Sequence, residues 1–68
     1  MNQEKIGAFI RDIRKESGLT QEQLAEALGV SQRSISRWET GKTMPAAKRL
    51  AEIANLFGCT VDDLLKEE

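Results

Sequence analysis

A short polar face between residues 31 and 40 has side chains that suit one kind of chemistry. At about 100° per residue, Ile35 and Trp38 fall on one side of a helix, so the polar side chains are presented on the other. Arginine pairs bidentately with guanine, and glutamine with adenine, in the major groove of DNA. The pattern favours a surface that contacts base edges over a merely solvated helix face. The candidate residues are Gln32, Arg33, Ser36 and Arg37.

The position of Arg33 supports an anionic partner outside the helix. Arg33 stands in the first helical turn, where the helix dipole favours an acidic residue by about 0.3–1 kcal/mol. Ser31 is a good N-cap, and Gly41 is a favoured residue just past the C-terminal end. The helix is therefore short, and both of its ends are defined by sequence.

The helix expected before it is also defined by capping residues. Thr20 stands at a favoured N-cap position, and Gln23 three residues later completes a capping box. Gly29 supplies the positive φ of a tight turn before the next helix. Residues 20–40 therefore predict two helices joined by a short turn. The buried stripe of the first helix consists of Leu24, Ala25 and Leu28, with Val30 filling the angle between the helices.

Apolar residues at three- and four-residue spacing predict three further helices. They cover residues 3–17, about 46 to 57, and 61 to about 66, and Thr60 with Asp63 forms a capping box before the last. No alternating strand pattern is present, so we expect an all-α domain over residues 1–68, a compact five-helix bundle. The expected core residues of these helices are Ile6, Phe9, Ile10, Ile13, Leu50, Ile53, Ala54, Phe57, Val61, Leu64 and Leu65, with Cys59 as a small buried hydrophobe.

The net charge of −1 conceals an uneven distribution of charge along the chain. Residues 31–50 contain five basic side chains and one acidic, whereas residues 61–68 contain four acidic side chains and one basic. Charges are screened over about 8 Å at physiological salt, so an acidic end on a distant face does not prevent the basic stretch from attracting phosphates.

Several function classes are excluded by composition. One cysteine and no histidine argue against a disulfide framework, a zinc site and histidine-based catalysis. Asp62 and Asp63 are adjacent and point in different directions, so no catalytic centre is assembled. No apolar run approaches the ~18 residues of a membrane span, and MNQEKIG lacks the layout of a signal peptide. We expect a cytoplasmic protein that is not an enzyme and has no cofactor or metal.

The stretch TQEQLAEALGVSQRSISRWETGK resembles the helix-turn-helix of the Cro-type phage repressors, the family also called XRE. The likeness extends over roughly residues 6–65 and implies the lambda-repressor-like five-helix domain. Thr40 departs from the pattern, because asparagine is frequent there in the family. The residues that carry the likeness as a set are Gln21, Leu24, Ala25, Leu28, Gly29, Val30, Ile35 and Trp38.

The resemblance implies three sets of site residues. The base-reading set is Gln32, Arg33, Ser36 and Arg37. For Arg33, a contact with a base and a contact with a phosphate are both left open. The phosphate-binding set is Gln21, Ser34, Thr40, Lys42 and Thr43, with loop amides near Thr43 and Met44. Arg14 and Glu39 form the structural pair that ties the reading helix to the scaffold. The alternatives are a solvated face for the reading set, a simple helix-start residue for Gln21 and a surface ion pair for Arg14 with Glu39.

The function implied is sequence-specific binding of double-stranded DNA by a transcriptional regulator, with repression as the expected mode. Compact members of the family usually act as homodimers that present two reading helices about 34 Å apart to a pseudo-palindromic operator, and the dimer surface is expected around the fourth and fifth helices. We expect a bacterial or phage protein associated with the nucleoid. The alternative is an antitoxin or anti-repressor whose acidic last helix binds a basic protein partner, such as a toxin or another regulator.

Overall fold

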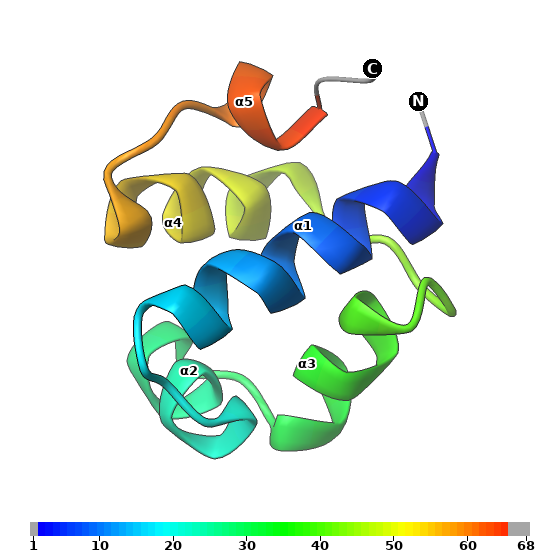
Figure 1. Ribbon diagram of the computed structural model, residues 1–68. Coiled ribbons are helices and arrows are strands. Elements are labelled where there is room, and N and C mark those ends of the chain that lie inside the picture. Colours follow the sequence, from blue (N-terminus) through cyan, green and yellow to red (C-terminus); the bar gives the residue numbers. More distant parts are fainter. Residues whose placement is uncertain (1, 66–68) are drawn as a thin grey trace.

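The five predicted helices are present in the computed structural model, which describes residues 2–65 and, for Leu65, the backbone alone (Figure 1). No strand occurs within the described residues, so the all-α fold class is confirmed. The predicted end of the last helix at Lys66 lies outside the described residues. The helices are α1 (Gln3–Glu16), α2 (Gln21–Leu28), α3 (Gln32–Glu39), α4 (Ala47–Phe57) and α5 (Val61–Leu65).

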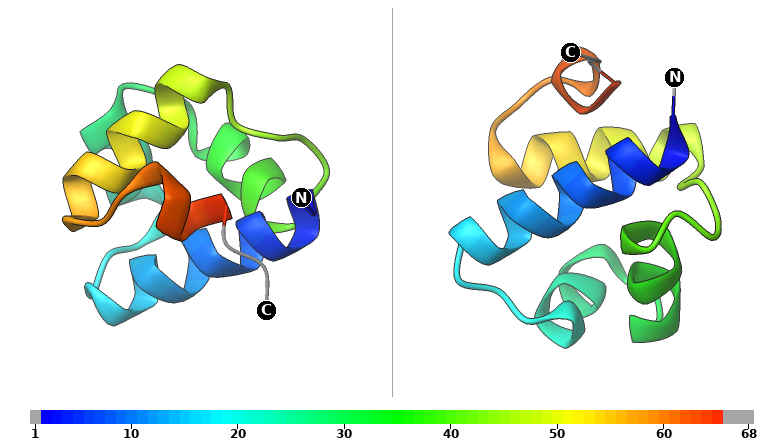
Figure 2. Two further views of the ribbon diagram at one scale, coloured as in Figure 1. Left: turned by 90° about the horizontal axis from the view of Figure 1, so that it is seen from above. Right: turned by 45° about the vertical axis from the view of Figure 1, so that its right-hand side comes forward.

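Helix α1 is the element against which the others are arranged. Figure 1 and the right-hand view of Figure 2 show α2 and α3 on one side of α1 and α4 and α5 on the other. Helix α1 packs against α3 and α5, and α2 packs against both α3 and α4. This arrangement holds α3 at one edge of the molecule, with its other side left to solvent.

Each helix contributes one fully buried aliphatic side chain to a single core. These side chains are Ile10, Leu24, Ile35, Ile53 and Leu64. Burying an aliphatic side chain of this size contributes roughly 1.5–3 kcal/mol relative to leaving it exposed. The shared core therefore fixes α3 through Ile35 while α3 keeps a polar outer face.

The helix ends follow the predicted capping chemistry. At α2, the Gln23 amide donates to the Thr20 hydroxyl at 3.0 Å, and the Thr20 amide donates to Gln23 Oε1 at 2.9 Å. The same reciprocal pair joins Thr60 and Asp63 before α5, with both distances at 3.1 Å. Gly29 closes α2 with φ of 72°, as the turn requires. Both predicted capping boxes are confirmed.

The predicted burial of Phe9 is wrong, because its side chain is 37% exposed. The buried stripe of α1 is rotated toward Gly7 and Arg14, where α1 crosses the end of α3. A Cβ at Gly7 would collide with the Trp38 carbonyl oxygen, so only glycine allows this approach. Close contact with α3 on one flank of α1 leaves Phe9 at the margin of the opposite flank.

Ile13, predicted as a core residue, is only half-buried, and three other predicted core residues occupy the edge of the core. Phe57, Cys59 and Val61 are partly buried and pack against the fully buried residues. The side chain of Leu65, predicted to turn inward, lies outside what the structure describes. No helix among residues 2–65 is long and apolar enough to cross a membrane.

Candidate nucleic-acid interface

Helix α3 divides sharply into a buried face and an exposed one. Ile35, Trp38 and Glu39 are buried, whereas the predicted reading residues lie on the solvent side. The Ser31 hydroxyl accepts the Ser34 amide at 3.2 Å, so the helix begins at its predicted cap. Among the reading residues, Gln32, Arg33 and Arg37 are exposed and Ser36 is half-buried.

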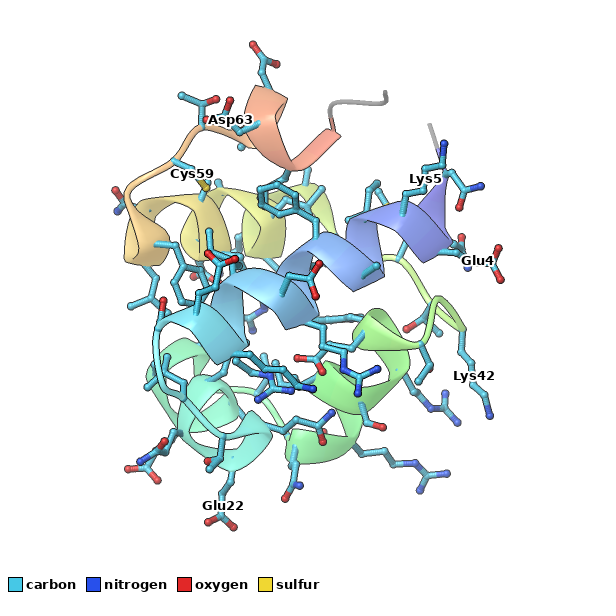
Figure 3. All side chains as sticks on the ribbon, viewed as in Figure 1. Glu4, Lys5, Glu22, Lys42, Cys59 and Asp63 are labelled. Carbon is cyan, nitrogen blue, oxygen red and sulfur yellow. The ribbon has the colours of Figure 1, made fainter. Side chains whose placement is uncertain are left out.

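A shallow polar hollow of about 260 Å³ lies over this face. It brings together residues from both the predicted base-reading and the predicted phosphate-binding sets. Lys42 reaches it from the loop after α3 and points into solvent (Figure 3). We call this hollow the reading hollow, and its lining residues are Arg33, Ser36, Arg37, Thr40 and Lys42.

The cations of the reading hollow are not neutralised by carboxylates of the described chain. Within residues 2–65, the side-chain ion pairs join Arg14 to Glu39 and Arg49 to Glu52. Arg49, part of the basic stretch in the sequence, also donates to the Leu28 carbonyl at 3.0 Å and so belongs to the scaffold. Arg49 therefore does not add to the exposed positive charge of this stretch, whereas Arg33, Arg37 and Lys42 line the reading hollow.

A buried ion pair holds the last residue of α3 to α1. Arg14 Nε lies 2.6 Å from Glu39 Oε2, and Arg14 Nη2 donates to Glu39 Oε1 at 3.1 Å. Their side chains are 9% and 2% exposed, so the alternative of a surface pair is excluded. The hydrogen bond to Glu39 raises the pKa of Arg14 above its ordinary value, and Arg14 Nη1 also donates to the Leu19 carbonyl at 2.7 Å. The pair joins α1, the start of α2 and the end of α3.

Gln21 has a structural partner that the sequence did not reveal. Its Nε2 donates to Glu39 Oε1 at 3.1 Å, so the first residue of α2 is tied to the last residue of α3. One amide hydrogen of Gln21 is left for an outside acceptor. The residue lies away from the reading hollow, at a second hollow where α1, α2 and α3 meet.

Three other predicted phosphate-binding residues are engaged within the chain. The Thr40 hydroxyl donates to the Ser36 carbonyl at 2.9 Å, and the Ser31 and Ser34 hydroxyls share a hydrogen bond of 3.1 Å. The Thr43 amide is directed at the Arg37 carbonyl at 3.4 Å. These groups satisfy the ends of α3, as free helix-end carbonyls and amides require. Of the predicted phosphate set, Lys42 is the residue with a free charged end in the reading hollow.

Two close contacts between α1 and the end of α3 hold α3 in position, and neither was predicted from the sequence. Gly7 lets α1 contact the carbonyl of Trp38, and the Gln3 carboxamide donates to the Gly41 carbonyl at 2.6 Å. An isolated glycine inside a helical pattern often marks such a packing contact, so Gly7 carried a usable signal. Together these contacts fix the loop that carries Lys42 to the start of α1.

No group of three or more histidine, cysteine or acidic residues within residues 2–65 could hold a metal ion. The lining residues of the reading hollow supply hydrogen-bond donors and cations from α3 and the loop that follows it.

Comparison with known proteins places this geometry in a family. The helix-turn-helix family model matches residues 10–64. The chain therefore belongs to the helix-turn-helix family, and the predicted resemblance to the Cro-type phage repressors is confirmed. This is a family of DNA-binding regulators and not of enzymes.

Two curated relatives and one solved structure illustrate the likeness. The HTH-type transcriptional activator BcrR of Enterococcus faecalis is 46% identical over 59 residues, which are 87% of this chain and 29% of that protein. The ImmF control region 10 kDa protein of Bacillus phage phi105 is 41% identical over 64 residues, covering 94% of this chain and 71% of that protein. The P22 c2 repressor in complex with a synthetic operator is 35% identical, with a TM-score of 0.85 over 93% of this chain and 96% of that chain.

Proposed function

We propose that this protein binds double-stranded DNA sequence-specifically and regulates transcription by placing α3 in the major groove. The observation that carries the proposal is the reading hollow, an exposed cationic face on a helix whose opposite face is anchored in the core. The likeness to a repressor solved on its operator supports it. Repression is the proposed mode, in which the bound protein blocks a promoter.

The proposed roles divide between discrimination and affinity. Gln32, Arg33 and Arg37 would contact base edges, each good bidentate pair contributing roughly 1–3 kcal/mol of discrimination. Ser36 lies between the two arginines and would contact a base as a weaker donor or acceptor. Lys42 would bind a phosphate, which positions the domain without reading sequence. Of the remaining predicted phosphate contacts, Gln21 keeps a spare donor, whereas the Thr40 hydroxyl would first have to give up its hydrogen bond to the Ser36 carbonyl. The Ser34 hydroxyl would donate to a phosphate while it accepts from Ser31, and Thr43 would use its hydroxyl, since its amide is directed at the Arg37 carbonyl.

The proposed assembly is a homodimer on a pseudo-palindromic operator. A domain of 68 residues buries only about 60% of its unfolded surface, so association adds stability as well as a second α3. Two reading helices about 34 Å apart would meet successive major grooves on one side of the duplex. The proposed contact surface of the dimer is the region around α4 and α5. The proposed location of the protein is the nucleoid of a bacterial cell.

Selection of bound sequences from a random duplex library tests the proposal. A DNA-reading dimer enriches a site with two inverted half-sites about one helical turn apart. A folded protein that enriches no site would refute the proposal. The alternative of an antitoxin or anti-repressor is not favoured, because the curated relatives reported above are regulators or control proteins.

A further inference from the structure

The loop after α3 is held on one side by the C-terminal turn of α3. The Gly41 amide donates to the Trp38 carbonyl at 3.1 Å, and the Lys42 amide donates to the Arg37 carbonyl at 2.9 Å. Gly41 has φ of 77°, so these two bonds form a Schellman ending, with glycine in the left-handed conformation. This ending fixes the backbone as far as the Lys42 amide.

The same loop is held on its other side by the first turn of α1. Gln3 Nε2 donates to the Gly41 carbonyl at 2.6 Å, although the two residues are 38 positions apart. Gly41 also lies against Glu4, because a Cβ added to Gly41 would come within 2.8 Å of Glu4 Cγ. Figure 1 and the right-hand view of Figure 2 show the loop beside the start of α1.

The bonds from Gln3 and to Arg37 act on a single peptide plane. The Gly41 carbonyl and the Lys42 amide belong to one planar unit, which is held from α1 at its oxygen and from α3 at its nitrogen. Without the Gln3 bond, the plane is held at its nitrogen alone, beside a glycine with a wide range of backbone angles. Gln3 therefore helps to set the direction in which the chain leaves α3.

The Lys42 side chain takes its position from this backbone. It is exposed and points into solvent (Figure 3), and no carboxylate of residues 2–65 forms an ion pair with its ammonium group. No partner among these residues therefore holds the charge over the reading hollow. The direction of the peptide plane before Lys42 decides where its ammonium group can reach.

We propose that Gln3 is a positioning residue for the phosphate contact of Lys42. Its carboxamide acts on the loop and not on the DNA, and it holds the loop so that Lys42 meets the duplex backbone beside α3. The inference rests on the proposed function and deepens it, because it assigns part of the DNA affinity to a neutral side chain of α1. Since Gln3 has no charge, its effect on the salt dependence of binding must pass through a cation.

The expected effect is bounded by the contact that Gln3 supports. We call the change of log K with log salt the salt slope. A phosphate contact contributes about 0.9 to this slope, or about five-fold in affinity at about 0.15 M salt. A neutral hydrogen bond shifts an equilibrium by roughly two- to ten-fold. Gln3→Met, which removes the donor and changes no charge, should therefore weaken binding by about two- to five-fold per protomer and lower the salt slope by about 0.4–0.9 per protomer.

Gln23→Met provides the matched control. Gln23 is an exposed carboxamide in the first turn of α2, and it accepts one backbone hydrogen bond, from the Thr20 amide at 2.9 Å. Both variants replace an exposed glutamine by methionine, remove one bond to the backbone and leave the net charge unchanged. Titrations of the selected operator at several salt concentrations should give a lower salt slope for Gln3→Met and the wild-type slope for Gln23→Met. Equal slopes in the two variants would overturn the inference.

A double-mutant cycle tests whether Gln3 acts through Lys42. In a Lys42→Ala background, Gln3→Met should cause no further loss of affinity or of salt slope, because the supported contact is already absent. In an Arg33→Ala background it should keep its full effect, since Arg33 lies in the first turn of α3, at the end opposite the loop. An equal loss in the Lys42→Ala background and in the wild type would assign Gln3 to another contact and contradict the proposal.

The outcomes separate this inference from the proposed function. A folded wild-type protein that binds no operator would refute both. Operator binding by Gln3→Met with the affinity and salt slope of the wild type would refute the role of Gln3 and leave the role of α3 intact. The ratio of affinities for operator and random duplex should be the same in Gln3→Met and the wild type, because a phosphate contact carries no sequence information. A lower ratio would place Gln3 with the base contacts and overturn the inference.

Discussion

Replacing Glu39 with glutamine should destabilise the fold far more than its small change in shape would suggest. Glu39 accepts hydrogen bonds from Arg14 Nε at 2.6 Å, Arg14 Nη2 at 3.1 Å and Gln21 Nε2 at 3.1 Å. The Glu39→Gln variant leaves the Arg14 guanidinium buried without its counter-charge and turns an amide donor toward other donors. Removing one partner of a buried ion pair costs about 3–5 kcal/mol.

This loss would be a large share of the total stability. A chain of 68 residues has a free energy of unfolding of about 3–10 kcal/mol, so Glu39→Gln should be close to unfolded or lose more than about 12 °C in Tm. Urea titration followed by the fluorescence of Trp38 measures the change, since this buried residue precedes Glu39 and is the only tryptophan of the chain.

Glu52→Gln is the matched control for this prediction. Glu52 pairs with Arg49 at 2.8 Å, but both side chains are about one third exposed. A pair that is open to solvent contributes about 0–1 kcal/mol, so the control should unfold near the wild type. A loss below about 1 kcal/mol in Glu39→Gln, or an equal loss in the two variants, would refute the view that the buried pair holds α3 to the scaffold.

Three further predictions concern packing, DNA reading and pH. Gly7→Ala should lose about 1–3 kcal/mol of stability by denaturant titration, because a Cβ meets the Trp38 carbonyl and outweighs the helix preference for alanine; a gain would contradict the close crossing. Arg37→Ala should relax base preference at one position of each operator half-site, whereas Lys42→Ala should weaken operator and random duplex alike and lower the salt slope by about 0.9 per protomer, or about 1.8 for the bound dimer; equal effects on specificity would contradict these roles. Burial, and next the nearby Asp63 carboxylate, raise the pKa of the Cys59 thiol. The folded state therefore retains this proton to higher pH than the unfolded state, and the stability from Cys59 is lost as pH rises from the ordinary thiol pKa through the folded-state pKa. Cys59→Ala should show a weaker alkaline loss in denaturant titrations, and an unchanged pH profile would contradict the effect.

The elements predictable from sequence were those with local causes. The capping box of Thr20 with Gln23 and the turn at Gly29 depend on residues within one helical turn, so their chemistry is readable without tertiary contacts. The outward face of α3 was likewise predictable, because Ile35 and Trp38 define the buried side of a short helix.

The elements that sequence reasoning missed depend on contacts between distant segments. Phe9 lies on the expected apolar stripe, but the crossing at Gly7 rotates the buried face of α1 away from it. The hydrogen bond from Gln21 to Glu39 spans 18 positions, and that from Arg49 to the Leu28 carbonyl spans 21. No local pattern distinguishes Gln21 and Arg49 from solvated side chains. The count of basic residues in the sequence therefore included Arg49, which is engaged within the fold, and overestimated the basic surface.

The most direct test of the central claim is the ratio of affinities for the selected operator and for a scrambled duplex of equal length, at about 0.15 M salt. If α3 reads base edges, wild-type protein should bind the operator at least about a thousand-fold more tightly. Equal affinity for both duplexes, with the protein folded, would contradict the claim that this face recognises sequence.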